Sequence, residues 1–385
     1  MVAQVLEGTI PALAFFLDAE RFFRFGVPPL TRGSRTLRAV TYSAYGRPPS
    51  VGEVPEPACP HDGVVVQVAA TGVCRSDWHA WKGHDPVALP HVPGHELAGT
   101  VAAVGPEVTR WQVGDRVTVP FVCGCGRCEC CRAGEAQVCP DQTQPGFTGP
   151  GSFAELVALH AADTNLVRLP DSVDFVTAAS LGCRFATSYR ALTAHGRLGP
   201  GDWLAVHGCG GVGLSAVMIG VALGARVVAV DVSRAALEKA VALGAQASVD
   251  ASEQDVVATV LEVTRGGAHV SVDALGSPGT AATSVRCLRR RGRHVQVGLL
   301  LGADAATPLP MDVVVARELE VYGSHGMAAR DYPPMLDLVA DGTLRPDLLV
   351  GRVIGLGEAG DALAAMSRPA TTTGLTVVDL GGSAG

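Results

Sequence analysis

Four cysteines follow one another at short intervals, in the pattern Cys-x2-Cys-x2-Cys-x7-Cys. They are Cys125, Cys128, Cys131 and Cys139. Four thiolates within reach of one another form a closed tetrahedral zinc site, which leaves no position for a substrate. An iron–sulfur cluster is the alternative metal group, and the neighbouring Cys123 and Cys130 are alternative ligands without the full spacing. We therefore predict a structural zinc site in this loop.

A second possible metal site is dispersed along the chain. Its members are Cys74, His95 and Cys183. Two thiolates and one imidazole hold zinc while leaving a fourth position for water or substrate, which catalysis requires. The spacing alone does not join Cys183 to the other two, because a single buried cysteine is commonly a small core residue. From the residues by themselves, both interpretations stay open.

A glycine turn lies between the predicted strand Trp203–His207 and a helix predicted over Leu214–Leu223. Its residues are Gly208, Cys209, Gly210, Gly211, Val212 and Gly213. Such glycines let a pyrophosphate approach the backbone, and the following helix offers its free N–H groups to the phosphates. A glycine-rich turn can also be merely a turn.

An acidic residue at the end of the next predicted strand favours dinucleotide binding. Asp231 follows Gly208 by 23 residues and ends the strand Arg226–Val230. A carboxylate there can accept hydrogen bonds from the adenosine ribose. Its charge repels a 2′-phosphate, so NAD is favoured over NADP, whereas Arg234 three residues later is the feature that would favour NADP.

The elements that must position these residues change along the chain. From Leu37 to about Pro170, short valine-containing runs separated by Gly and Pro predict β-sheet with frequent turns. From about Phe185, predicted strands alternate with helices, which indicates parallel strands with right-handed crossovers. We predict an α/β fold: a doubly wound parallel-sheet domain (186–325) inserted in a β-rich zinc-binding domain (37–185 and 326–380), after an N-terminal extension (1–36).

Composition excludes several functional classes. Charged residues make up 17% and hydrophobic residues 48%, as in folded rather than disordered chains. A net charge of -7 provides no basic surface for phosphates, so we expect no nucleic-acid partner. The uncharged stretch Trp203–Ala225 could span a bilayer, but its glycine turn favours a buried strand and helix, and we expect no membrane partner.

Eleven cysteines without a secretory signal favour thiols and metal over disulfides, hence a cytoplasmic protein. The first 36 residues contain five of the ten phenylalanines, interleaved with charged residues. Three alternatives remain for this segment: an amphipathic interface helix, an extension that docks on the rest of the protein, or a start codon assigned too far upstream.

From about Leu37 to Asp379, the chain resembles the medium-chain, zinc-dependent alcohol dehydrogenase family. The segment Gly94-His95-Glu96-x2-Gly99-x5-Gly105-x2-Val108 is similar to that family's zinc signature. The four cysteines, the glycine turn and Asp231 also follow in the family's order. The resemblance implies a Rossmann domain within a GroES-like catalytic domain, NAD(H), one catalytic and one structural zinc per chain, and a homodimer or homotetramer.

The resemblance implies a role for residues around each site. Cys74, His95 and Cys183 match the catalytic zinc ligands. Glu96 matches an acid that can approach the metal, and Asp77 matches the carboxylate that orients His95.

Other positions match residues that handle the proton, the cofactor and the substrate. Ser76 matches the hydroxyl that relays the substrate proton, and His79 the solvent end of that relay. Arg75 matches a pyrophosphate contact, and Thr187 and Val212 match residues that press against the nicotinamide. The positions matching the substrate channel are Trp81 and Phe121. Trp78 and His84 have no assigned role, and His325 is expected either at the nicotinamide end of the cleft or in a surface turn.

We predict an oxidoreductase (EC 1.1.1.-) that interconverts an alcohol and its aldehyde or ketone with NAD(H). In the family, polyol-oxidising members carry a carboxylate where this chain has Cys183, and quinone-reducing members lack both zinc sites. The alternatives are a reductase of an imine or activated alkene in a biosynthetic pathway, a non-catalytic NAD-binding protein, and a zinc-dependent interaction module.

Overall fold

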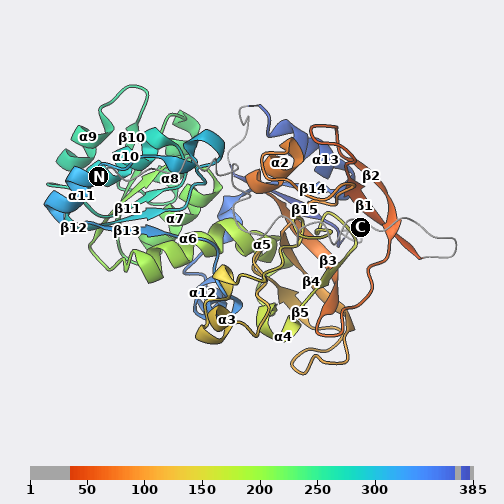
Figure 1. Cartoon of the computed structure of the whole chain (residues 1–385). Helices are drawn as coiled ribbons and strands as arrows, with labels where there is room; N and C mark the ends of the chain where they lie inside the picture. Colours follow the sequence, from red (N-terminus) through yellow and green to blue (C-terminus); the bar gives the residue numbers. More distant parts are fainter. Residues whose placement is uncertain (1–34, 369–373, 382–385) are drawn as a thin grey trace, which may run out of the picture.

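The computed structural model describes residues 35–368 and 374–381, which form two lobes (Figure 1). Residues 1–34 lie outside this range, so the expected extension over 1–36 stays a prediction, as do the domain boundaries. One lobe is built on a parallel sheet and the other on mainly antiparallel strands. This arrangement confirms the predicted fold class.

Within the described residues, the parallel sheet has six strands in the order β10-β9-β8-β11-β12-β13. These strands are β8 (Trp203–His207), β9 (Arg226–Asp231), β10 (Ala247–Asp250), β11 (Ala268–Asp273), β12 (Leu288–Gln296) and β13 (Glu320–Gly323). The helices around them are α7 (Gly211–Ala222), α8 (Arg234–Ala242), α9 (Val256–Val263), α10 (Pro278–Arg286) and α11 (Met311–Arg317). The strand order reverses beside β8, and in doubly wound sheets such a reversal opens the ligand crevice.

Both faces of the parallel sheet are buried, which explains its continuous apolar strands. Alternate residues of β8 enter different cores: Leu204 packs with α7 and α8 on one face, whereas Ala205 packs with α9 and α10 on the other. The uncharged stretch Trp203–Ala225 therefore forms β8, the glycine turn and α7. No helix in the described part of the chain is long and apolar enough to cross a membrane.

The other lobe consists of mainly antiparallel sheet with short helices. Its strands are β1 (Thr36–Thr41), β2 (Ser50–Pro55), β3 (Val64–Val73), β4 (Glu96–Val104), β5 (Arg116–Thr118), β6 (Leu156–Leu159), β7 (Val167–Arg168), β14 (Val350–Gly355) and β15 (Leu375–Asp379). Its helices are α2 (Arg75–Lys82), α3 (Glu129–Ala133), α4 (Ala162–Asn165), α12 (Tyr332–Ala340) and α13 (Leu356–Ala365). The long β3 lies at the centre, between β4 and β15.

Two short helices, α5 (Phe175–Ala179) and α6 (Ala186–Arg190), lie between the lobes (Figure 1). They are joined by a π-helical turn over Leu181–Phe185, a wide turn frequently found at functional sites. Phe185 belongs to a core that runs from Val377 of β15 to Val206 of β8 without interruption. The lobes therefore share part of their hydrophobic core.

Two elements begin earlier than the sequence predicts. Helix α7 starts at Gly211 rather than Leu214, because the turn glycines already adopt helical backbone. Strand β12 starts at Leu288 rather than His294, and its arginines fall where the pairing with β11 is irregular. Charged residues interrupt the apolar pattern there, so the pattern reveals only the second half of the strand.

The close approach of α7 to the preceding turn requires glycine at residue 213. A Cβ built there would lie 1.7 Å from the Gly208 carbonyl oxygen. We expect Gly213→Ala to lower the free energy of unfolding by about 1–3 kcal/mol, since overpacking forces the backbone to move. Denaturant unfolding measures this loss. Gly210→Ala is the matched control, because a Cβ there has no heavy atom within 4 Å, and equal stability of the two variants would contradict the prediction.

Candidate functional site

Three distant segments bring Cys74, His95 and Cys183 together. Cys74 follows β3 and caps α2, His95 immediately precedes β4, and Cys183 lies in the π-helical turn. Their ligand atoms, together with a carboxylate oxygen of Glu96, all lie within 4.8 Å of one another. We call Cys74, His95 and Cys183 the cysteine–histidine cluster. Its members are buried or half-buried.

One buried carboxylate organises two members of this cluster. Asp77 Oδ1 accepts hydrogen bonds from His95 Nδ1 (2.8 Å) and from the Gly94 backbone N–H (3.0 Å). Asp77 Oδ2 accepts the Cys74 backbone N–H (3.1 Å). Because Asp77 occupies His95 Nδ1, Nε2 is the ring nitrogen that remains for a metal.

The donor set fits zinc. Among the described residues, His95 Nε2 is one of the buried side-chain atoms that have no hydrogen-bond partner, which a bound cation would supply. The Cys183 thiol and the Arg184 guanidinium hold the pKa of Cys74 well below its usual range. Two thiolates and an imidazole are the ligands of zinc sites that keep an open position.

Glu96 is held by an arginine that no sequence pattern singled out. Arg184 Nε donates to Glu96 Oε1 (3.0 Å), and its Nη2 donates to Oε2. The side chains of both residues are nearly or fully buried. The sequence does contain one signal for this pair: Arg184 is a charged residue inside an apolar segment. A charged side chain that is buried needs a partner of opposite charge.

Ser76 and His79, the two members of the predicted proton relay, have different neighbours in the structure. The Ser76 hydroxyl lies 3.9 Å from Cys74 Sγ, beside the cluster. His79 Nδ1 faces His84 Nδ1 at 3.1 Å, and both rings contact Trp78. Burial lowers the pKa of His79 to about 4, with smaller effects from His84 and Arg75. The relay from Ser76 to His79 stays a prediction.

Aromatic rings surround His95. Phe121 packs edge-on against it at 6.1 Å between ring centres, and Phe147, which the sequence did not indicate, lies at 5.2 Å. His325 in turn packs edge-on against Phe121 at 5.0 Å. His325 is thus half-buried beside the cluster rather than in a surface turn. Trp81 is buried against the core of its own lobe, where its indole N–H donates to the Arg47 carbonyl.

The glycine turn lies close to the segment that carries the third cluster residue. The Ser188 hydroxyl contacts the carbonyls of Arg184 (2.9 Å) and Val212 (2.8 Å). Thr187, in the same helix, donates to the Cys183 carbonyl. Thr187 and Val212, which are predicted to meet the nicotinamide, therefore lie on segments adjacent to the one that carries Cys183.

Asp231 lies at the base of the glycine turn. Its carboxylate accepts the backbone N–H of Cys209 (2.6 Å) and of Ser233 (2.8 Å). These bonds fix the acid at the end of β9, beside the turn. Arg75 lies in the other lobe, where it donates to the Met366 carbonyl and stacks on Trp78.

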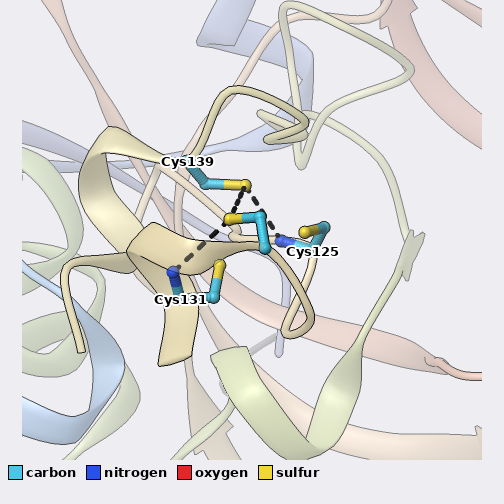
Figure 2. A group of neighbouring side chains, drawn as sticks. Cys125, Cys131 and Cys139 are labelled. Atoms are coloured by element: carbon cyan, nitrogen blue, oxygen red, sulfur yellow. Dashed lines mark hydrogen bonds between the residues drawn. The ribbon is translucent and has the colours of Figure 1, made fainter. Parts of the chain in front are cut away.

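The structure brings the other four predicted ligands, Cys125, Cys128, Cys131 and Cys139, into a four-cysteine cluster around the short helix α3 (Figure 2). Cys128 Sγ lies 3.6 Å from Cys139 Sγ and accepts the Cys131 backbone N–H. That N–H is the largest of several effects that together lower the pKa of Cys128 to about 7, which favours a thiolate. This donor set also fits zinc, and its four protein ligands leave no coordination position for water or substrate.

The alternative ligands lie outside the four-cysteine cluster. Within the described residues, the group contains neither Cys123 nor Cys130. Cys123 is buried instead, and burial raises its pKa to about 12. Asn165, which the sequence did not indicate, holds the loop by bonding both the N–H and the carbonyl of Gly124.

The Asp77 carboxylate should strengthen zinc binding at the cysteine–histidine cluster, and its removal tests this. Asp77→Asn cannot accept all three donors, so we expect zinc affinity of the cysteine–histidine cluster to fall roughly 10- to 100-fold. Zinc per chain, measured after dialysis against a chelator, should then drop while the four-cysteine zinc is retained. Asp255→Asn, which alters a helix cap in the other lobe, should change neither site. Full retention of both zinc ions in Asp77→Asn would refute the role of this carboxylate.

Comparison with known proteins places the chain in one family. Residues 60–171 match the alcohol dehydrogenase GroES-like domain, and residues 211–341 match the zinc-binding dehydrogenase domain. An alcohol dehydrogenase of Geobacillus stearothermophilus is 35% identical over 330 residues, which cover 85% of this chain and 96% of the relative.

Solved structures with a similar fold support the same family assignment. An NAD-dependent alcohol dehydrogenase is 30% identical, with a TM-score of 0.80 over 89% of this chain and 99% of that one. Benzyl alcohol dehydrogenase from Acinetobacter calcoaceticus is 26% identical, with a TM-score of 0.83 over 90% and 99% of the two chains. The chain thus belongs to the medium-chain, zinc-dependent alcohol dehydrogenase family.

Proposed function

We propose that the cysteine–histidine cluster holds the catalytic zinc of an enzyme that interconverts an alcohol and its aldehyde or ketone. Two similar proteins are named for this activity: an alcohol dehydrogenase that is 35% identical and an NAD-dependent alcohol dehydrogenase that is 30% identical. The observation that carries the residue assignment is the buried, unpartnered His95 Nε2 in a two-thiol site, oriented by Asp77. The four-cysteine cluster holds the structural zinc.

Zinc and NAD(H) would supply the chemistry that the side chains lack. Zinc held by Cys74, His95 and Cys183 would act as a Lewis acid toward the substrate oxygen, and the nicotinamide would carry the hydride. The protein residues fix the geometry. Asp77 holds the imidazole of His95 and the backbone of Cys74, and the Arg184 pair holds Glu96 beside them.

Protons leave through groups that are neutral near pH 7. Ser76 is the hydroxyl beside the cluster, and His79, whose pKa is lowered to about 4, can accept a proton only transiently. In our proposal, Ser76 passes the substrate proton toward His79 and solvent. Glu96 is a poor base for this step because both of its oxygens already accept bonds from Arg184.

NAD(H) fits the glycine turn and Asp231. The N-terminus of α7 offers unpaired N–H groups to the pyrophosphate. Asp231 retains acceptor capacity for ribose hydroxyls after bonding two backbone N–H groups. The rings of Phe121, Phe147 and His325 favour a substrate with a planar or apolar group. An imine or activated alkene is the alternative substrate class on this fold.

We also infer a cytoplasmic protein that assembles as a dimer or tetramer. The thiol-rich metal sites need a reducing compartment, and the oligomeric state follows the family resemblance. Size-exclusion chromatography with light scattering tests the assembly.

Removing the third catalytic ligand should separate activity from folding. We expect Cys183→Ser to reduce NADH oxidation over a panel of aliphatic, allylic and aromatic aldehydes to background while thermal stability stays close to wild type. Cys128→Ser should instead lower the melting temperature, because a closed zinc site contributes folding energy. Cys59→Ser is the control, since Cys59 lies in neither cluster. Unchanged turnover of Cys183→Ser would refute the ligand assignment.

The choice of cofactor should depend on the charge of Asp231. Asp231→Asn keeps an acceptor for the backbone but no longer repels a 2′-phosphate. We expect the NADP/NAD ratio of kcat/KM to rise by about tenfold or more, which corresponds to about 1.4 kcal/mol. Steady-state kinetics with both cofactors measures it. An unaltered ratio would contradict the ribose role of Asp231.

A further inference from the structure

Arg184 reaches beyond its ion pair, toward the glycine turn. A Cβ built on Gly211 would lie 2.6 Å from Arg184 Cδ and 3.4 Å from its Nη1. Gly211 is the first residue of α7, the helix whose N-terminus faces the predicted pyrophosphate. The arginine side chain thus lies between the metal-site acid of one lobe and the cofactor turn of the other.

The hydrogen bonds of the guanidinium leave one side for another ligand. Nε and Nη2 donate to Glu96, while Nη1 is the guanidinium nitrogen nearest to the Cβ position on Gly211, at 3.4 Å. A guanidinium carries five N–H donors in a fixed fork, so the bonds to Glu96 do not exhaust it. Its side chain is nine-tenths buried, at 9% exposure.

The electrostatics of this position favour an anion. The N-terminus of a helix carries a positive partial charge, which makes a neighbouring buried cation unfavourable unless an anion is present. Glu96 balances Arg184 on the side of the metal site. On the other side, Arg184 lies against Gly211, the first residue of α7, so a phosphate oxygen bound at this helix N-terminus could accept bonds from both.

We propose that Arg184 binds the cofactor pyrophosphate through Nη1 while its other edge holds Glu96, so that one side chain links the cofactor to the metal site. This inference rests on the proposed function, because it needs a dinucleotide at the glycine turn. The contact also requires the segment that carries Arg184 to be held in place beside the glycine turn. The Ser188 hydroxyl links the two by contacting the carbonyls of both Arg184 and Val212.

Binding of ADP compared with adenosine isolates the phosphate contact. Isothermal titration calorimetry of the zinc-loaded protein gives the ratio of the two affinities. We expect Arg184→Lys to lower that ratio by roughly tenfold or more, since a charged hydrogen bond is lost. A merely structural role would weaken both ligands together and leave the ratio unchanged. An unchanged ratio in Arg184→Lys would overturn the proposal.

Arg190→Lys is the matched control, because Arg190 lies on the same segment but pairs with Glu135. The ADP/adenosine affinity ratio of this variant should equal that of wild type.

If Arg184→Lys does not fold, Glu96→Gln provides the second test, since it removes the carboxylate charge that competes for Arg184 and keeps the arginine. A ratio at or above wild type in Glu96→Gln supports the proposal. A fall there shows that the ion pair sets phosphate affinity, and overturns it.

The same titrations distinguish this inference from the proposed function. If wild-type protein binds neither NADH nor ADP, the cofactor assignment itself fails. If wild type binds both and Arg184→Lys keeps the ADP/adenosine ratio, only the role of Arg184 fails. Zinc per chain is measured in each variant, and we expect Arg184→Lys to retain both ions.

Discussion

The buried carboxylate of Asp77 is the constraint on which the candidate site depends. It accepts three hydrogen bonds, one from the His95 ring and two from the backbone at Cys74 and Gly94. A carboxylate removed from water needs such partners, and here every partner belongs to a metal ligand or its neighbour. The same group therefore closes the N-terminal turn of α2 and sets which imidazole nitrogen faces the metal.

The part of the site that follows from local sequence was largely predictable. The four cysteines lie within 14 residues of one another, and a loop that short brings their thiols together almost regardless of the rest of the fold. The glycine turn was recognisable for a similar reason, since a strand, a turn and a helix are consecutive in the chain. The alternation of strands and helices likewise predicted the parallel sheet.

What depended on distant packing was not predictable from these residues alone. Cys183 is 88 residues from His95 in sequence, and only the family resemblance joined the two before the fold was known. Arg184, Phe147 and Asn165 escaped notice because each acts through a partner in another segment. The predicted link from Ser76 to His79 also depends on such packing, and it stays a prediction.

The π-helical turn has a mechanical consequence. Cys183 lies on the segment where the chain passes from one lobe to the other, whereas Cys74 and His95 belong to the antiparallel lobe. The hydrophobic core continues through that crossing without a break. Cys183 therefore comes from the segment that joins the two lobes, so the cysteine–histidine cluster is complete only while the shared core keeps the lobes in this arrangement.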